Sequence, residues 1–219
     1  RKPMSINTVI LFIHSQRRFK MNLVDESKFL REGWPYVEGH IVPDTMTCRM
    51  IHTILKMTRS RNVLEIGFNY GHSAFAFLNV DANIKYHSVD IGQHEYTLAN
   101  ASKLKEMYPD RFEFTHMSSH DLEPRTLDMY DTIFVDGDHS IEGMSKDLNL
   151  CNESGVEYIL FDDYVSSLSM DERVESPNPK RLIHHYLSKP DFPYKKVHEF
   201  AYPSSDRINH MVLLKRENL

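Results

Sequence analysis

Apolar residues along the chain follow two alternating patterns. Short runs rich in Val, Ile, Leu and Phe, such as Val63 to Ile66, are typical of buried strands, and most are followed by a longer segment with helical spacing of apolar residues. Asp44, directly after Pro43, marks the start of the first helix. The pattern predicts strands over 62–67, 84–90, 112–116, 131–136 and 156–162, and helices from Asp44 to about Met57 and over 72–79, 95–107, 140–151 and 180–188.

This alternation indicates parallel strands joined by right-handed crossovers, with helices on both faces of the sheet. The tail departs from it, because Tyr194 to Phe200 and His210 to Leu214 are strand-like runs joined by a turn around 203–206 with no helix between them. We therefore expect a Rossmann-like, doubly wound α/β fold with about seven mostly parallel strands and a C-terminal antiparallel hairpin.

The N-terminal part of the chain is less regular. Residues 1–43 show no sustained period and include Trp34, which predicts an irregular arm or lid over a site. Residues 44–219 are predicted to form a single domain, because 219 residues with 41% hydrophobic content suffice for one α/β core.

Composition narrows the class of partner. A net charge of -5 and a pI near 6.2 give no general attraction to nucleic acid. Cys48 and Cys151 are too few and too far apart for a disulfide scaffold, which favours a reducing compartment. The apolar run from Val9 to Ile13 is short for a signal peptide, and no stretch approaches the roughly 20 apolar residues of a membrane span. We expect a cytoplasmic protein without membrane contact.

The segment from Asn62 to Ser73 carries the first chemical signal, because a buried strand meets a glycine-spaced turn at Gly67 and Gly71 and then an apolar helix. Glu65 would repel a pyrophosphate, so the ligand is expected to be cationic or to carry hydroxyls, and S-adenosylmethionine fits that description better than NAD. Asp90 ends the next strand 23 residues after Gly67 and is the predicted ribose ligand. Alone, such an Asp more often caps a loop.

Other polar residues follow the later strands. Ser119 and His120 offer groups for an adenine edge, with an ordinary polar turn as an equal alternative. Asp136 follows another buried strand, and Asp138 is expected to cap the helix that begins near Ser140.

The fifth predicted strand ends in Asp162 and Asp163. Together with Asp136, these carboxylates would repel one another, and a bound divalent cation such as Mg²⁺ relieves that repulsion. The alternative for Asp163 is a solvent-facing residue. His139 lies at the mouth of this group, where a base, a substrate contact and a helix-start hydrogen bond are all open roles.

With these residues in view, the chain resembles class I S-adenosylmethionine-dependent methyltransferases over roughly residues 40–215, and the segment from Val135 to Gly143 resembles the macrolide-sugar and cephalosporin-biosynthesis O-methyltransferases. The pair Asp162 and Asp163 is similar to that group and to catechol O-methyltransferases. Catechol enzymes carry Lys where this chain has His139 and Asn where it has Asp163, so catechol specificity is not expected.

The resemblance implies that Asp136, Asp162 and Asp163 bind Mg²⁺ and that the acceptor is a small molecule of the sugar, polyol or phenol type. Asp136 and His139 are the predicted catalytic residues. The predicted cofactor-binding set is Glu65, Gly67, Asn69, Gly71, Ser73, Asp90, Ser119, His120 and Asp136.

The expected reaction is direct displacement at the methyl carbon of the sulfonium by an acceptor hydroxyl. The alternatives are a non-catalytic nucleotide- or S-adenosylmethionine-binding module and a nucleic-acid methyltransferase. A dinucleotide oxidoreductase is disfavoured because Gly-x-Gly-x-x-Gly is absent from the first turn. The sequence leaves the oligomeric state undecided, and a homo-oligomer is one alternative.

Overall fold

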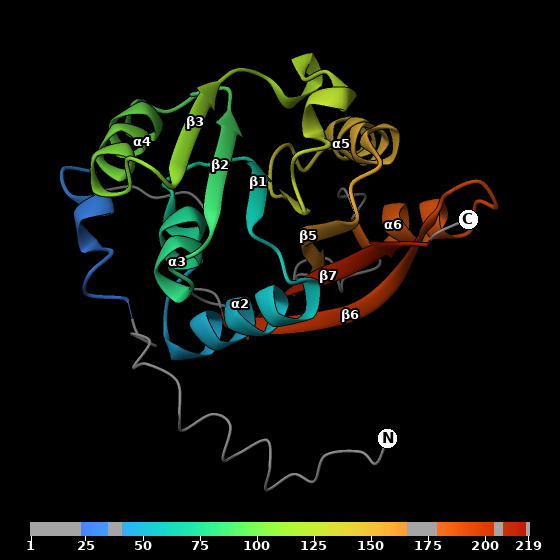
Figure 1. Ribbon diagram of the computed structural model, residues 1–219, viewed down its shortest axis with the longest axis horizontal. Helices are drawn as coiled ribbons and strands as arrows, with labels where there is room; N and C mark the ends of the chain where they lie inside the picture. The colour runs from blue at the N-terminus through green and yellow to red at the C-terminus, as the bar shows by residue number, and fades with distance from the viewer. Residues whose placement is uncertain (1–22, 35–40, 166–178, 204–207, 218–219) are drawn as a thin grey trace, which may run out of the picture.

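The computed structural model describes residues 23–34, 41–165, 179–203 and 208–217. Its centre is a seven-stranded sheet with the strand order β3-β2-β1-β4-β5-β7-β6 (Figure 1). The parallel strands are β1 (Asn62–Ile66), β2 (Lys85–Asp90), β3 (Phe112–His116), β4 (Thr132–Val135) and β5 (Tyr158–Val165). The antiparallel strands are β6 (Tyr194–Pro203) and β7 (Ile208–Arg216).

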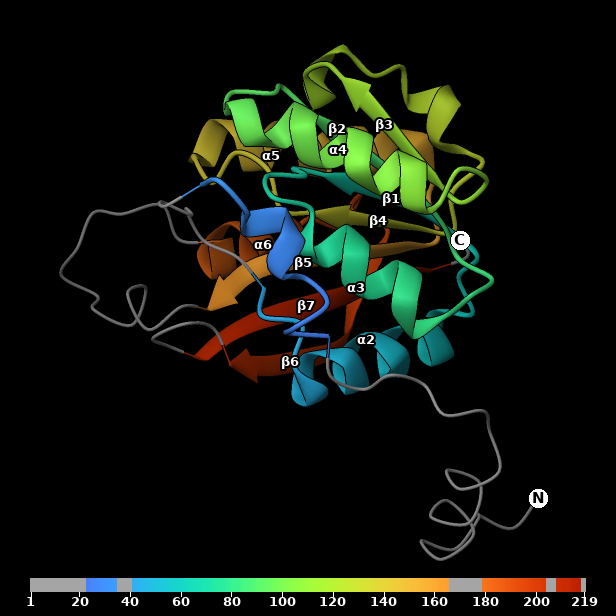
Figure 2. The same cartoon turned by 90° about the vertical axis from the view of Figure 1, so that its left-hand side faces the viewer.

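Helices cover both faces of the sheet (Figure 2). One face carries α2 (Thr45–Thr58), α3 (His72–Val80) and α4 (Glu95–Met107), and the other carries α5 (Ile141–Ser154) and α6 (Pro179–Leu187). Alternate side chains of β1 explain this arrangement, because Val63 joins the first core and Leu64 joins the second. The predicted Rossmann-like fold with a C-terminal antiparallel hairpin is confirmed. Its predicted turn at 203–206 lies largely outside the described residues.

Local sequence explains how the main helices begin. Asp44 caps α2 by accepting a hydrogen bond from the backbone N–H of Thr47 at 2.8 Å. Ser140 caps α5, and Asp138 in turn accepts hydrogen bonds from the N–H and the hydroxyl of Ser140 at 2.8 and 2.9 Å. The residue that caps α5 is thus Ser140 and not Asp138 as predicted, and Asp138 supports the cap by holding Ser140.

The described part of the N-terminal region packs on the domain. It holds a short 3-10 helix, η1 (Lys28–Arg31), whose Leu30 is fully buried. Asn100 of α4 donates a hydrogen bond to the carbonyl of Leu30 at 2.7 Å, and the ring of Trp34 meets that of Tyr96 edge-on at 5.8 Å. Residues 23–34 are thus anchored to α4, and a lid function for the arm stays a prediction.

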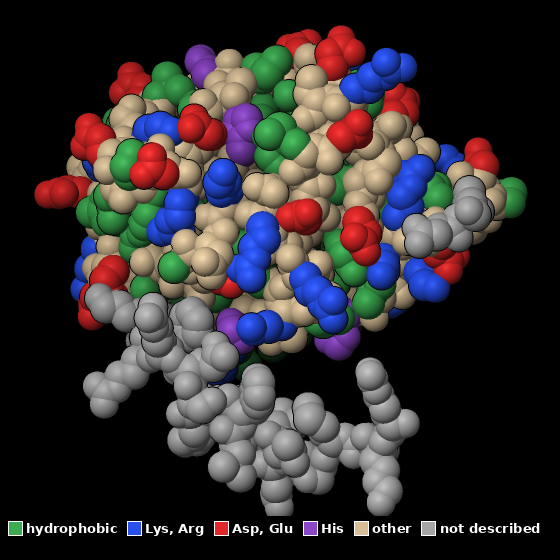
Figure 3. Space-filling model, in the orientation of Figure 1, with side chains coloured by type: hydrophobic (Ala, Val, Ile, Leu, Met, Phe, Trp, Pro, Cys, Tyr) green, Lys and Arg blue, Asp and Glu red, His purple; other side chains and the backbone are tan. Residues whose placement is uncertain are grey.

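No helix among the described residues is long and apolar enough to cross a bilayer. On the face drawn in Figure 3, Lys and Arg side chains are interspersed with Asp and Glu. Two further 3-10 helices, η2 (Ser119–Asp121) and η3 (Pro124–Leu127), connect β3 to β4.

Candidate functional site

A cavity of about 750 Å³ opens at the carboxyl ends of the parallel strands. It lies at the point where the strand order reverses, between β1 and β4. The predicted site residues that line it are Gly67, Asn69, Gly71, Ser73, Asp90, Ser119, His120, Asp136, His139, Asp162 and Asp163. Residues from five different segments of the chain therefore share one cavity, and Glu65 is the predicted residue outside its wall.

The turn after β1 needs glycine for two reasons. Gly67 has a φ of 93°, and a Cβ atom there would overlap the backbone carbonyl of Asp136. Gly71 has a φ of 81° and begins α3, and a Cβ atom there would overlap the ring of Phe68. The turn therefore brings backbone into the cavity wall at a place where a side chain would block the approach of β4.

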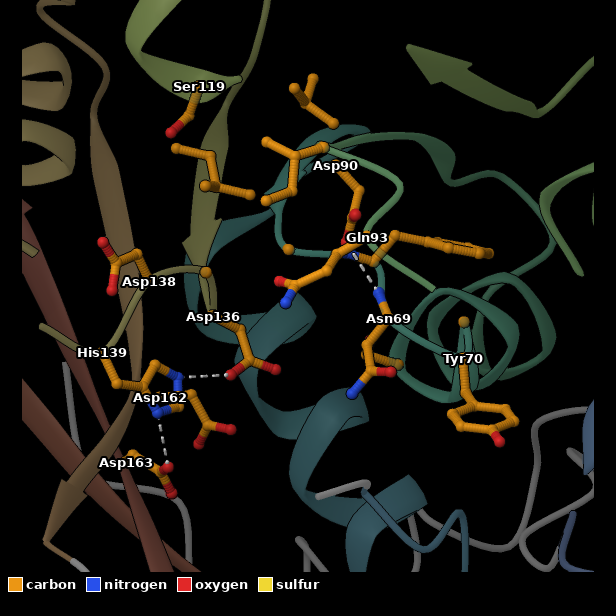
Figure 4. A pocket seen from close by; sticks show the side chains of 18 of the residues that line it. Asn69, Tyr70, Asp90, Gln93, Ser119, Asp136, Asp138, His139, Asp162 and Asp163 are labelled. Atoms are coloured by element: carbon orange, nitrogen blue, oxygen red, sulfur yellow. Dashed lines mark hydrogen bonds and ion pairs between the residues drawn. The ribbon is translucent and has the colours of Figure 1, made fainter. Parts of the chain in front are cut away.

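Asp90 ties this turn to the end of β2. One of its carboxylate oxygens accepts hydrogen bonds from the backbone N–H groups of Phe68 and Asn69 at 2.8 and 3.0 Å, and the other accepts one from Gly92 at 2.7 Å. A carboxylate offers about four acceptor positions, so capacity for a ligand hydroxyl remains. Asp90 thus shapes the loop and faces the cavity at the same time (Figure 4).

Glu65 lies beneath the cavity rather than in its wall. It is fully buried, and it accepts hydrogen bonds from the hydroxyl of Ser73 and from that of Ser88, the latter at 2.6 Å. Burial raises the pKa of Glu65 to about 8, and the two hydroxyls oppose that rise. Ser73 lines the cavity, so Glu65 reaches it only by holding the hydroxyl of Ser73.

The other side of the cavity holds Asp136, His139, Asp162 and Asp163 (Figure 4). The imidazole of His139 lies between two carboxylates, with Nε2 3.4 Å from Asp136 and Nδ1 3.2 Å from Asp163. Hydrogen bonds to these two carboxylates raise the pKa of His139 to about 11. In this arrangement His139 is an imidazolium at neutral pH, and it becomes a base only when another cation compensates the carboxylates.

The C-terminal hairpin completes this group. The hydroxyl of Tyr202 donates to both carboxylate oxygens of Asp162 at 2.7 and 2.9 Å, and Asn209 donates to Asp163 at 2.9 Å. Burial, and then the charges of Asp136 and Asp163, raise the pKa of Asp162 well above its ordinary value. Sequence analysis missed Tyr202 and Asn209, because only the strand order shows that the hairpin meets the carboxyl end of β5.

The three carboxylates suit a hard divalent cation, because they supply oxygen ligands only and two of them have raised pKa values caused partly by neighbouring carboxylates. Within the described ranges, no group of three or more His, Cys, Asp or Glu side chains is already arranged around a common point. Instead, His139 contacts one oxygen of Asp136 and one of Asp163, Asn209 donates to the other oxygen of Asp163, and Tyr202 donates to both oxygens of Asp162. Binding a cation would therefore require His139 to move away from Asp136 and Asp163.

Ser119 and His120 lie in η2 on the far side of the cavity. The hydroxyl of Ser119 donates to a buried carboxylate, Asp147 of α5, at 2.7 Å. Sequence analysis did not single out Asp147, because within α5 it looks like one more polar helix residue. Only the packing of α5 against η2 connects it to the site.

Residues 64–164 match the family model described as a methyltransferase domain. Among curated protein sequences, none matches this chain.

Several solved structures share the fold. An O-methyltransferase of Bacillus cereus in complex with SAH has 14% identity, a TM-score of 0.66 and coverage of 97% of each chain. An O-methyltransferase of Streptomyces achromogenes involved in tomaymycin synthesis, in complex with SAM, has 14% identity and a TM-score of 0.65 over 96% of this chain and 95% of that one. A putative caffeoyl-CoA O-methyltransferase of Staphylococcus aureus has 16% identity and a TM-score of 0.59 over 95% and 99%.

Proposed function

We propose that this chain, which carries a methyltransferase domain of the class I fold, transfers a methyl group from S-adenosylmethionine to an oxygen atom of a small hydroxylated acceptor. One observation carries the proposal. A single cavity joins the glycine turn and Asp90 on one side to Asp136, His139 and Asp163 on the other. A donor site and an acceptor site that share one cavity are what direct group transfer requires.

The donor side has groups suited to each part of S-adenosylmethionine. The carboxylate of Asp90 has acceptor positions left for ribose hydroxyls beside the backbone N–H groups that it holds. Ile91 and Met117, which follow the ends of β2 and β3, supply apolar parts of the cavity wall that suit a planar base. The carboxylates nearby favour the positive sulfonium over an anionic cofactor such as NAD.

The chemical step is a displacement at the methyl carbon. A bond forms between the acceptor oxygen and the methyl carbon as the bond from carbon to sulfur breaks, which leaves S-adenosylhomocysteine and releases the hydroxyl proton. Because the positive charge of the sulfonium disappears during transfer, positioning of the two reactants supplies most of the rate. His139 is the proposed proton acceptor once its two carboxylates are compensated by another cation.

Asp136, Asp162 and Asp163 are the proposed ligands for Mg²⁺ or a similar divalent cation. Such an ion, when bound, lowers the pKa of an acceptor hydroxyl and holds it in place. An acceptor of the sugar, polyol or phenol type fits this chemistry, because two neighbouring oxygens of such an acceptor can both bind the ion. The similarity to solved O-methyltransferases supports oxygen as the acceptor atom. A cytoplasmic location and a homo-oligomer stay expectations.

The first test is a calorimetric titration of S-adenosylhomocysteine into the full chain, followed by a transfer assay. Tritiated methyl groups from S-adenosylmethionine are offered to sugars, polyols and phenols, once with Mg²⁺ and once with a chelator. The proposal expects saturable binding and transfer that the chelator abolishes.

Two variants serve as controls for each other. Asp90→Ala should weaken S-adenosylhomocysteine binding by about 10- to 100-fold, whereas Asp162→Asn should keep wild-type binding and lose transfer. Binding without transfer to any acceptor would favour a non-catalytic module. Transfer to RNA in the presence of chelator would favour a nucleic-acid methyltransferase, and absence of binding would overturn the proposal.

A further inference from the structure

Asp147 is a buried charge next to the cavity that the proposed reaction does not use. It lies on the face of α5 that packs into the core, and its exposed fraction is 1%. Its helix neighbours Met144, Leu148 and Cys151 are apolar and buried in the same core. An ionised group in such surroundings is costly unless it has partners, so the contacts of Asp147 need an explanation.

Those contacts point toward the cavity wall. One carboxylate oxygen accepts the hydrogen bond from Ser119 at 2.7 Å, and Nε2 of His120 lies 3.9 Å from the same oxygen. The other oxygen has no hydrogen-bond partner among the described residues, and it lies 3.6 Å from the position that a Cβ atom on Gly137 would take. Ser119, His120 and Gly137 all line the cavity, so Asp147 supports the wall from behind.

The hydrogen bond decides what Ser119 can offer to a ligand. An ionised carboxylate only accepts hydrogen bonds, and a serine hydroxyl has one proton to donate. Because that proton is directed to Asp147, the oxygen of Ser119 presents only lone pairs to any other partner. Ser119 in this site is therefore a hydrogen-bond acceptor.

We infer that Asp147 is a specificity-determining residue, which makes Ser119 an acceptor and so selects a cofactor whose base carries an amino group at this edge over one that carries a carbonyl oxygen. The inference rests on the proposed binding of S-adenosylmethionine. Adenine carries an amino group at position 6, which donates, whereas a 6-oxo purine carries an acceptor there. A carbonyl oxygen facing the lone pairs of Ser119 would leave both acceptors unpaired and would repel them.

The test compares two ligands that differ in the group at position 6, and the 6-oxo purine also carries a proton on N1. S-adenosylhomocysteine and its 6-oxo analogue S-inosylhomocysteine are titrated by calorimetry into the full-length wild-type chain and its variants. We expect the wild type to prefer S-adenosylhomocysteine by about 10- to 100-fold. In Asp147→Ala the hydroxyl of Ser119 is free to turn and donate, so the ratio of the two dissociation constants should fall toward one.

Matched variants separate this role from a purely structural one. Ser119→Ala removes the hydroxyl that contacts the base. The double variant, with Asp147→Ala and Ser119→Ala, should show the same ratio as either single variant, because the two residues act as one unit. Ser145→Ala removes a half-buried hydroxyl of the same helix, one that donates to the carbonyl of Ile141, and should keep the wild-type ratio. Should Asp147→Ala fail to fold, Ser119→Ala carries the test alone, because it removes the hydroxyl itself and its ratio should also fall toward one.

The outcomes are distinguishable. A wild-type chain that binds neither ligand overturns the proposed function and the inference with it. A wild type that binds S-adenosylhomocysteine, together with an unchanged ratio in Asp147→Ala or Ser119→Ala, overturns the inference alone. Weaker binding of both ligands by the same factor would show that Asp147 only supports the fold.

Discussion

At the scale of single residues, Asp90 combines a structural and a binding role. Its carboxylate holds three backbone N–H groups of two loops. Asp90→Ala should weaken S-adenosylhomocysteine binding by about 10- to 100-fold, because the ribose ligand is lost and the loop N–H groups lose their acceptor. Calorimetry measures the affinity, and urea unfolding measures the loss of stability. Wild-type affinity in this variant would exclude Asp90 as a ribose ligand.

Glu65 makes stability depend on pH. Its pKa rises from 4.5 in the unfolded chain to about 8 in the folded one, so between these values only the folded state holds the proton. Its contribution is therefore complete below pH 4.5 and is lost as the pH rises toward 8, a change on the order of a few kcal/mol.

Glu65→Gln tests this pH dependence, because glutamine has the shape of the protonated acid and does not titrate. Thermal unfolding at pH 5 and at pH 9 should show a smaller loss of stability in Glu65→Gln than in the wild type. Parallel curves for the two proteins would mean that Glu65 is ionised in the folded state at neutral pH.

At the scale of elements, the contact between the ends of β1 and β4 depends on Gly67. The N–H of Asp136 donates to the carbonyl of Ile66 at 2.8 Å, and a side chain at Gly67 would push these strand ends apart. Gly67→Ala should cost roughly 3 kcal/mol or more in unfolding free energy, and it should abolish S-adenosylhomocysteine binding. Urea denaturation and calorimetry measure the two effects.

Gly155 supplies the matched control. Its φ of 74° is also in the left-handed region, but a Cβ atom there would meet nothing within 4 Å. Gly155→Ala should therefore cost only about 1 kcal/mol, from backbone strain alone, and should leave binding unchanged. Equal losses in the two variants would show that overlap with Asp136 does not matter.

At the scale of the whole molecule, ligands of the two sides of the cavity should stabilise the fold independently. S-adenosylhomocysteine at 100 times its dissociation constant contributes about 2.7 kcal/mol, which raises Tm by roughly 5 to 10 °C in a domain of this size. Mg²⁺ should add a further increase that a chelator reverses. Asp162→Asn should lose only the Mg²⁺ increment in a thermal shift measurement, and an undiminished increment would place the ion elsewhere.

The sequence by itself determined the fold and the edge of the sheet at which chemistry is possible. Periodicity is local, so strands, helices and the resemblance to class I methyltransferases could be recognised without contacts, and both the fold and the resemblance are confirmed. Parallel strands share one carboxyl edge, so the sequence could also bring Asp90, Asp136 and Asp162 together.

Only the tertiary structure decided what each of these groups faces. The strand order β5-β7-β6 brings Tyr202 and Asn209 to Asp162 and Asp163, which no local pattern encodes. The packing of α5 on η2 brings Asp147 to Ser119, although these two residues are far apart in sequence. Burial beneath α3 turns Glu65 from an expected ligand contact into a support for Ser73. Hydrogen-bond direction and pKa depend on such distant neighbours, so they follow from packing rather than from spacing along the chain.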